Sequence, residues 1–167
     1  DMKTNFKGFL YAGLMIINDE PFLIEYNVRM GDPECQTILP RLKTNFFDII
    51  EATVNKKLDQ INLDWYNSKA LSIVVCSKGY PERFEKDKEI NNLDKVILEK
   101  DEFIFHAGTK IYKSKIFSNG GRVLNFVANK KSFKESKNST IDLIRKIKWE
   151  NGFYRKDIGF KVIDEWE

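Results

Sequence analysis

The stretch Glu25-Tyr26-Asn27-Val28-Arg29-Met30-Gly31-Asp32-Pro33-Glu34 is the most informative part of this sequence for both fold and function. It begins inside an apolar run, residues 22–28, and ends in a polar loop. Another apolar run, residues 9–17, precedes it across the short polar turn 18–21. Neither run has a helical period, so we predict two buried strands joined as an antiparallel hairpin.

Polar side chains alternate with apolar ones along the second of these strands. Glu25, Asn27 and Arg29 are spaced two residues apart, so a regular strand places them on one face. Glu25 and Asn27 offer the hard oxygen donors that Mg²⁺ binds alongside substrate phosphates and waters. An arginine beside such a pair is suited to clamp a carboxylate or a transferring phosphoryl group.

The loop after the strand adds two carboxylates. Gly31 allows a sharp turn of the backbone, and Asp32 and Glu34 follow, where a carboxylate can hold a substrate ammonium group. Spacing alone also fits the solvated face of an ordinary sheet, because a Glu and an Asn two residues apart are a weak signal. Both interpretations stay open on the residues alone.

Beyond the loop, a helix is predicted from an N-cap at Asn45, with Asp48 in its first turn. Its apolar stripe consists of Phe47, Ile50, Val54 and Leu58. A polar, irregular stretch, residues 57–68, then indicates a boundary between subdomains.

The remainder of the chain predicts a sheet and a helix. Short strands are expected over residues 70–76, 96–98, 103–105, 111–117 and 123–127. Ser118-Asn119-Gly120-Gly121 predicts a hairpin turn between the last two, because Asn-Gly readily adopts positive φ. Ser132 and Glu135 form a capping box that opens a helix.

Composition narrows the class of protein. The 167 residues are 42% hydrophobic with a net charge of +3, which predicts a packed core without the basic footprint of a nucleic-acid binder. Cys35 and Cys76 lack zinc or disulfide spacing and fit a reducing cytoplasm. No apolar run reaches the roughly 18 residues of a membrane span. The chain begins with Asp1 rather than Met, as expected for a piece of a longer protein.

With its continuation to Gln36, the opening stretch resembles the end of the ATP-grasp core in the phosphoribosylamine–glycine ligase family, whose pattern reads E-[FY]-N-x-R-[FM]-G-D-P-E-x-Q. Further blocks similar to that family follow in the same order and cover nearly the whole chain: residues 8–15, 38–42, 79–81, 105–109, 118–124 and 153–159.

The resemblance implies an α+β fold in two parts. Residues 1–60 are expected to be the C-terminal end of the ATP-grasp core, made of antiparallel strands plus a helix. Residues 61–167 are expected to be the C-terminal domain, a small mixed β-sheet with a packed helix. The N-terminal part and the ATP-grasp lid of the family are missing from the chain.

The resemblance also implies an activity. The family joins glycine to 5-phosphoribosylamine through a glycyl phosphate, giving glycinamide ribonucleotide, ADP and phosphate in purine synthesis, with ATP as co-substrate. Glu25 and Asn27 match its Mg²⁺ or Mn²⁺ ligands, and Arg29 matches a catalytic residue that stabilises anions. The substrate-binding positions comprise Arg29, Gly31, Asp32, Pro33 and Glu34.

Two departures limit what the chain does alone. The preceding strand, Leu14-Met15-Ile16, offers no further metal carboxylate, and no glycine-rich phosphate loop is present. We therefore expect an isolated chain that is inactive, and an intact enzyme that is a cytoplasmic monomer without nucleic-acid or membrane partners. The alternatives are another ATP-grasp carboxylate–amine ligase and a non-catalytic binding module of the same fold. His106 has a structural interpretation and a weaker substrate-side one.

Overall fold

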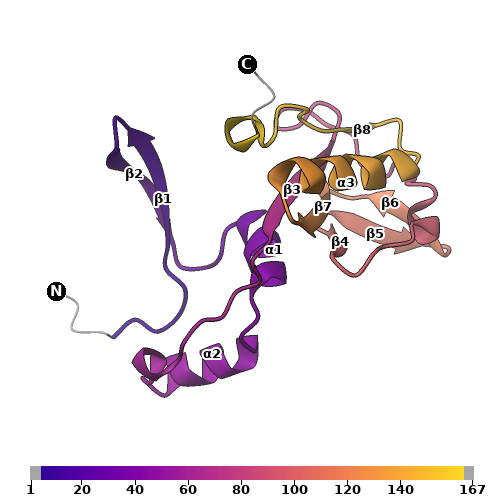
Figure 1. The fold of residues 1–167 in the computed structure, drawn as a ribbon. Coiled ribbons are helices and arrows are strands. Elements are labelled where there is room, and N and C mark those ends of the chain that lie inside the picture. The colour runs from indigo at the N-terminus through magenta and orange to yellow at the C-terminus, as the bar shows by residue number, and fades with distance from the viewer. Residues whose placement is uncertain (1–4, 164–167) are drawn as a thin grey trace. The chain divides into compact units, whose positions relative to one another are not determined.

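The fold is described by a computed structural model over residues 5–163, which divide into two compact units. Residues 5–35 and 42–66 form the first unit, and residues 36–41 and 67–163 form the second. Helices and antiparallel strands occur together, which confirms the α+β class (Figure 1). In the described part of the chain, no helix combines the length and hydropathy needed to cross a bilayer.

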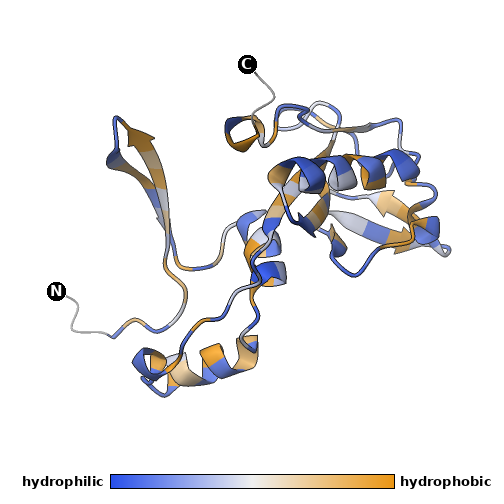
Figure 2. Cartoon of the chain, in the orientation of Figure 1, coloured by the Kyte–Doolittle hydropathy of each residue, from blue (hydrophilic) through white to orange (hydrophobic). Residues whose placement is uncertain are grey.

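The first unit begins with the predicted hairpin. Strand β1 (Tyr11–Ile17) pairs antiparallel with β2 (Glu20–Asn27), and both turn residues between them, Asn18 and Asp19, adopt positive φ. Figure 2 shows apolar residues along both strands. At least half of each of the following side chains is exposed: Leu14, Met15, Ile16, Ile17, Phe22, Leu23 and Ile24. A two-stranded hairpin with so much exposed apolar surface is marginal without further packing.

Helix α2 (Phe46–Val54) confirms the predicted cap. The Asn45 side chain accepts a hydrogen bond of 2.9 Å from the Phe47 amide, and Asp48 lies in the first turn. The carboxylate of Asp48 complements the partial positive charge at this end of the helix.

The predicted apolar stripe of α2 is wrong in part. The buried residues are Ile49 and Ala52, whereas Phe47 remains 67% exposed. The Phe9 ring stacks on Phe46 at 5.8 Å between centroids, so the segment before β1 packs against the start of the helix. Leu58 lies outside α2, in the 3₁₀ helix η2 (Leu58–Gln60).

The second unit is built on a four-stranded sheet. Its order is β4 (Glu102–His106), β7 (Arg122–Lys130), β3 (Lys69–Ser77) and β8 (Gly152–Phe153), with every pair antiparallel. The expectation of a mixed sheet is therefore wrong in its strand directions. β7 and β8 run parallel to each other, but β3 lies between them, so no parallel ladder forms.

The strand predicted at 96–98 is absent. The 3₁₀ helix η3 (Leu93–Lys95) precedes an extended segment with no ladder partner, and Ile97 within it is 84% exposed. Only Val96 packs against the core. An apolar triplet is too short to predict a strand by itself.

The predicted hairpin turn at Asn119-Gly120 is also wrong. Strand β5 (Thr109–Tyr112) pairs instead with β6 (Lys115–Ser118), and the turn between them is Lys113-Ser114, with φ values of 46° and 61°. Neither Asn119 nor Gly120 has positive φ. The strand after them, β7, is already paired on both sides by β3 and β4, so β6 cannot reach it.

Helix α3 (Phe133–Lys146) covers one face of this sheet (Figure 1). The Ser136 hydroxyl donates to the Lys69 carbonyl at 2.5 Å, and the Thr140 hydroxyl donates to its own helix at Ser136. Leu143 is fully buried against the sheet. The fully buried side chains of the strands beneath include Ile73, Leu124 and Phe126.

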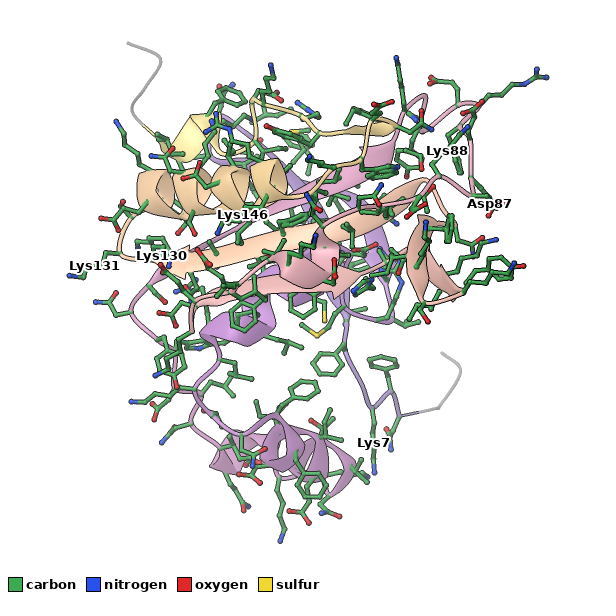
Figure 3. The ribbon with its side chains drawn as sticks, turned by 90° about the vertical axis from the view of Figure 1, so that its right-hand side faces the viewer. Lys7, Asp87, Lys88, Lys130, Lys131 and Lys146 are labelled. Atoms are coloured by element: carbon green, nitrogen blue, oxygen red, sulfur yellow. The ribbon has the colours of Figure 1, made fainter. Side chains whose placement is uncertain are left out.

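A buried glutamate and a half-buried lysine form an ion pair at one edge of this arrangement. Glu102 on β4 accepts from the Glu99 amide at 3.0 Å and from the Ser139 hydroxyl of α3, and lies 3.7 Å from the Lys130 ammonium. Burial acts to raise the pKa of Glu102, but these three donors together lower it below its ordinary range. Figure 3 shows Lys131, the next residue, pointing away from the protein.

The capping box of α3 supports a stability prediction. The Ser132 hydroxyl accepts from the Glu135 amide, and the Glu135 carboxylate accepts from the Ser132 amide, both at 3.2 Å. Ser132→Ala leaves an end amide unpaired and is expected to destabilise the chain by about 1 kcal/mol. Urea unfolding followed by circular dichroism measures this change. Glu135→Gln keeps an acceptor and is the matched control; an equal loss in both variants contradicts the prediction.

Candidate metal and substrate site

One face of the β1–β2 hairpin gathers four residues. Tyr11 pairs opposite Asn27, and Gly13 pairs opposite Glu25, so all four positions share a face of the antiparallel ladder. The Asn27 amide nitrogen donates to Glu25 Oε1 at 3.0 Å. A Cβ at Gly13 would lie 3.1 Å from Glu25 Cγ, so the glycine leaves room for the carboxylate.

The Glu25–Asn27 pair fits a hard divalent cation. Both side chains present oxygen donors, and a half-turn of the Asn27 amide brings its oxygen to the position now held by its nitrogen. Mg²⁺ usually takes only a few protein ligands and keeps waters or phosphates in its other positions. Within residues 5–163, no three side chains of the His, Cys, Asp or Glu type cluster to form a complete metal site.

Arg29 lies outside the ladder. β2 ends at Asn27, so the alternation predicted from the sequence stops two residues too early to fix Arg29 on the same face. Its guanidinium Nη1 donates to the Met30 carbonyl at 2.9 Å, and the side chain is exposed. The remaining donors of this fork face outward, where an anionic substrate group can reach them.

The loop from Gly31 to Glu34 closes as a turn into helix α1 (Glu34–Ile38), with the Asp32–Pro33 peptide cis. The Cys35 amide donates to the Gly31 carbonyl at 2.9 Å. A Cβ at position 31 would lie 2.2 Å from Glu34 Oε2. Gly31 makes this turn without positive φ, and its missing side chain leaves room for the Glu34 carboxylate.

Tyr11 is a site residue that the sequence interpretation missed. Its hydroxyl donates to Glu34 Oε1 at 3.2 Å. The negative charge of Glu34 and this hydrogen bond, followed by burial and the charge of Glu25, raise the Tyr11 pKa. The strand pattern identifies Tyr11 only as part of an apolar run, because its position opposite Asn27 depends on the ladder register.

Two other residues have defined surroundings. Burial, and secondly the charge of Asp32, raise the pKa of the Cys35 thiol, so this side chain is a poor nucleophile. His106, in the second unit, has its Nδ1 2.8 Å from the Thr109 hydroxyl. This local bond orients the imidazole, at the end of β4, toward the first residue of β5.

Two segments of the chain match known protein families. Residues 70–161 match the family described as "Phosphoribosylglycinamide synthetase, C domain", and residues 1–35 match its "ATP-grasp (A) domain". The first match alone covers more than half of the chain. The chain belongs to the phosphoribosylglycinamide synthetase family.

Individual members of the phosphoribosylglycinamide synthetase family agree along most of the chain. It is 46% identical over 92% of its length to a phosphoribosylamine–glycine ligase of Caldanaerobacter subterraneus. It is 41% identical over 93% of its length to the chicken (Gallus gallus) trifunctional purine biosynthetic protein adenosine-3, of which it covers 16%. It superposes on the crystal structure of phosphoribosylamine–glycine ligase from Thermotoga maritima with a TM-score of 0.75 and 31% identity over 90% of its length. The chain spans about 36% of the length of the bacterial ligases.

Proposed function

We propose that this chain is the C-terminal part of an ATP-dependent ligase that joins glycine to 5-phosphoribosylamine. The products are glycinamide ribonucleotide, ADP and phosphate. The observation that supports this most directly is the Glu25–Asn27 pair beside the Arg29 to Glu34 loop, in a chain whose relatives are named phosphoribosylamine–glycine ligases. We call the whole polypeptide the intact ligase.

The proposed reaction has two steps. A glycine carboxylate oxygen attacks the γ-phosphorus of ATP, and the bond to the ADP oxygen breaks, which gives glycyl phosphate. The phosphoribosylamine nitrogen then attacks the acyl carbon, the bond to phosphate breaks, and the nitrogen loses a proton. Both steps move negative charge between oxygens, so positioning and electrostatic stabilisation account for most of the catalysis.

The residues of this chain take distinct parts in the proposal. Glu25 and Asn27 would hold Mg²⁺ or Mn²⁺, which supplies positive charge to the ATP phosphates. Arg29 stabilises the anion that forms during phosphoryl and acyl transfer through its outward donors. The substrate-binding loop comprises Gly31, Asp32, Pro33 and Glu34.

The proposed organisation assigns residues 1–60 to the end of the ATP-grasp core and residues 61–167 to the C-terminal domain. The family matches at 1–35 and 70–161 support this division. The exposed apolar strands of the β1–β2 hairpin support a larger domain around it. The free cysteines Cys35 and Cys76 support a reducing, cytoplasmic setting, and the small net charge supports the proposal that no nucleic acid is bound. A monomer without a membrane partner is part of the same proposal.

The proposal predicts that the isolated 167-residue chain makes no glycinamide ribonucleotide. Most of the length of the related ligases lies outside this chain. The groups that hold ATP are proposed to lie in that other part. Glycine-dependent release of ADP, assayed with Mg²⁺ and phosphoribosylamine, measures turnover. The intact ligase is the positive control. Turnover by the isolated chain, or an intact ligase that releases no ADP in response to glycine, contradicts the proposal.

A further inference from the structure

The Glu34 carboxylate has a defined hydrogen-bond partner within the first unit. Tyr11 Oη, from β1, donates to its Oε1 at 3.2 Å. Its Oε2 lies over Gly31, where the Cβ of any other residue would approach it to 2.2 Å. The Cys35-to-Gly31 backbone bond of 2.9 Å closes the turn beneath. A glutamate without a partner samples several rotamers, whereas the bond from Tyr11 favours one position for this carboxylate.

The place is next to the hairpin face that holds Glu25 and Asn27. Tyr11 lies directly opposite Asn27 in the ladder, so its side chain projects on that face. The charge of Glu25 contributes to raising the Tyr11 pKa, which agrees with this proximity. Tyr11 therefore connects the proposed metal pair to the proposed substrate loop.

The chemistry of the Glu34 carboxylate favours a cationic ligand. Its Oε1 already accepts from a neutral phenol, while Oε2 retains lone pairs for a further donor. Glycine carries a permanent ammonium at neutral pH, one carbon away from the carboxylate that receives the phosphoryl group. An acceptor for that ammonium must therefore lie close to the metal pair, as Glu34 does.

We propose that Glu34 binds the glycine ammonium group and that Tyr11 is a positioning residue that holds the Glu34 carboxylate in place for it. This inference rests on the proposed ligase function and deepens it, because it assigns one residue of the substrate-binding loop to glycine. Tyr11 acts only through Glu34 and touches no reacting atom.

The test measures steady-state constants of the intact ligase for each of its three substrates. Glu34→Gln keeps the shape but removes the charge, and is expected to raise the KM for glycine about a hundredfold. Tyr11→Phe removes one hydrogen bond to a charged group and is expected to raise the same KM about tenfold. The KM for ATP and the kcat at saturating glycine change less than about twofold in Tyr11→Phe.

The double variant separates positioning from a general structural role. If Tyr11 works through Glu34, Tyr11→Phe adds nothing to the effect of Glu34→Gln, because the two changes remove the same interaction. Tyr26→Phe is the matched control: Tyr26 belongs to the same hairpin, pairs opposite Ala12 rather than on the face of Glu25, and is 62% exposed. We expect it to leave all three KM values unchanged.

Different results would contradict the proposed ligase function and the proposed roles of Tyr11 and Glu34. A wild-type intact ligase without glycine-dependent ADP release removes the proposed function and this inference together. An active wild type in which Tyr11→Phe leaves the glycine KM unchanged overturns only the inference. Multiplicative effects in the double variant, or an increase in the KM for phosphoribosylamine instead of glycine, overturn it equally.

Discussion

Glu25→Gln in the intact ligase is expected to lower kcat by about a hundredfold to a thousandfold and to move the metal dependence to higher concentration. Glutamine has the same shape and keeps one oxygen donor, so the β1–β2 hairpin should be unaffected. The substitution removes the negative charge that attracts a divalent cation to a strand on which the only other proposed ligand is the neutral Asn27. Turnover measured against Mg²⁺ concentration reports both effects.

The control for Glu25→Gln is Glu20→Gln. Glu20 is the first residue of β2 and pairs with Ile17 at the far end of the ladder from Asn27. Loss of its charge alters the same strand by the same chemical change, and we expect turnover and metal dependence to stay at the wild-type level. A Glu25→Gln enzyme whose metal dependence is unchanged would remove Glu25 from the metal shell.

Local signals in the sequence predicted local structure well. The Asn45 cap and the Ser132–Glu135 capping box were both confirmed, because each is a hydrogen bond between residues at most three apart. The strands around residues 11–17, 20–27 and 69–77 were also found close to their predicted places. Runs of apolar residues without a helical period are enough to predict a strand.

Strand pairing beyond the first hairpin was the part that the sequence could not provide. The Asn119-Gly120 dipeptide is a strong turn signal, yet the turn formed at Lys113-Ser114 because β7 already had two partners in the sheet. Likewise, the contact between Tyr11 and Glu34 spans 23 residues and depends on the register of β1 against β2. Both outcomes are decided by tertiary packing, which overrides local preference.

The role of Gly31 shows the same limit at a single residue. The sequence predicts a sharp turn at Gly31, and the turn forms without positive φ at this residue. The Glu34 carboxylate lies in the space that a Cβ at this position would take. The sequence shows that a glycine is present, but it does not show which atom lies in the space beside it.

The loops that contain Gly108 and Gly120 meet at one end of the four-stranded sheet. The Gly108 amide donates to the Val123 carbonyl at 3.1 Å, and the Asn119 amide donates to the Gly108 carbonyl at 2.7 Å. A Cβ at Gly108 would lie 2.5 Å from the Arg122 carbonyl oxygen and 3.1 Å from the Gly120 Cα. The Arg122 carbonyl is part of the backbone of β7, which is paired with β3, so it cannot move aside without disturbing the ladder.

Gly108→Ala is therefore expected to destabilise the chain by about 3 kcal/mol, the upper range for overpacking. Gly120→Ala is the matched control, because its Cβ would lie 3.3 Å from both the Arg122 carbonyl oxygen and the Gly108 Cα, a contact that small shifts relieve. We expect a loss of less than about 1 kcal/mol there. Neither glycine has positive φ, so backbone strain does not distinguish the two. Urea midpoints at constant m-value measure the difference; equal destabilisation would show that both glycines serve the loop conformation rather than this close approach.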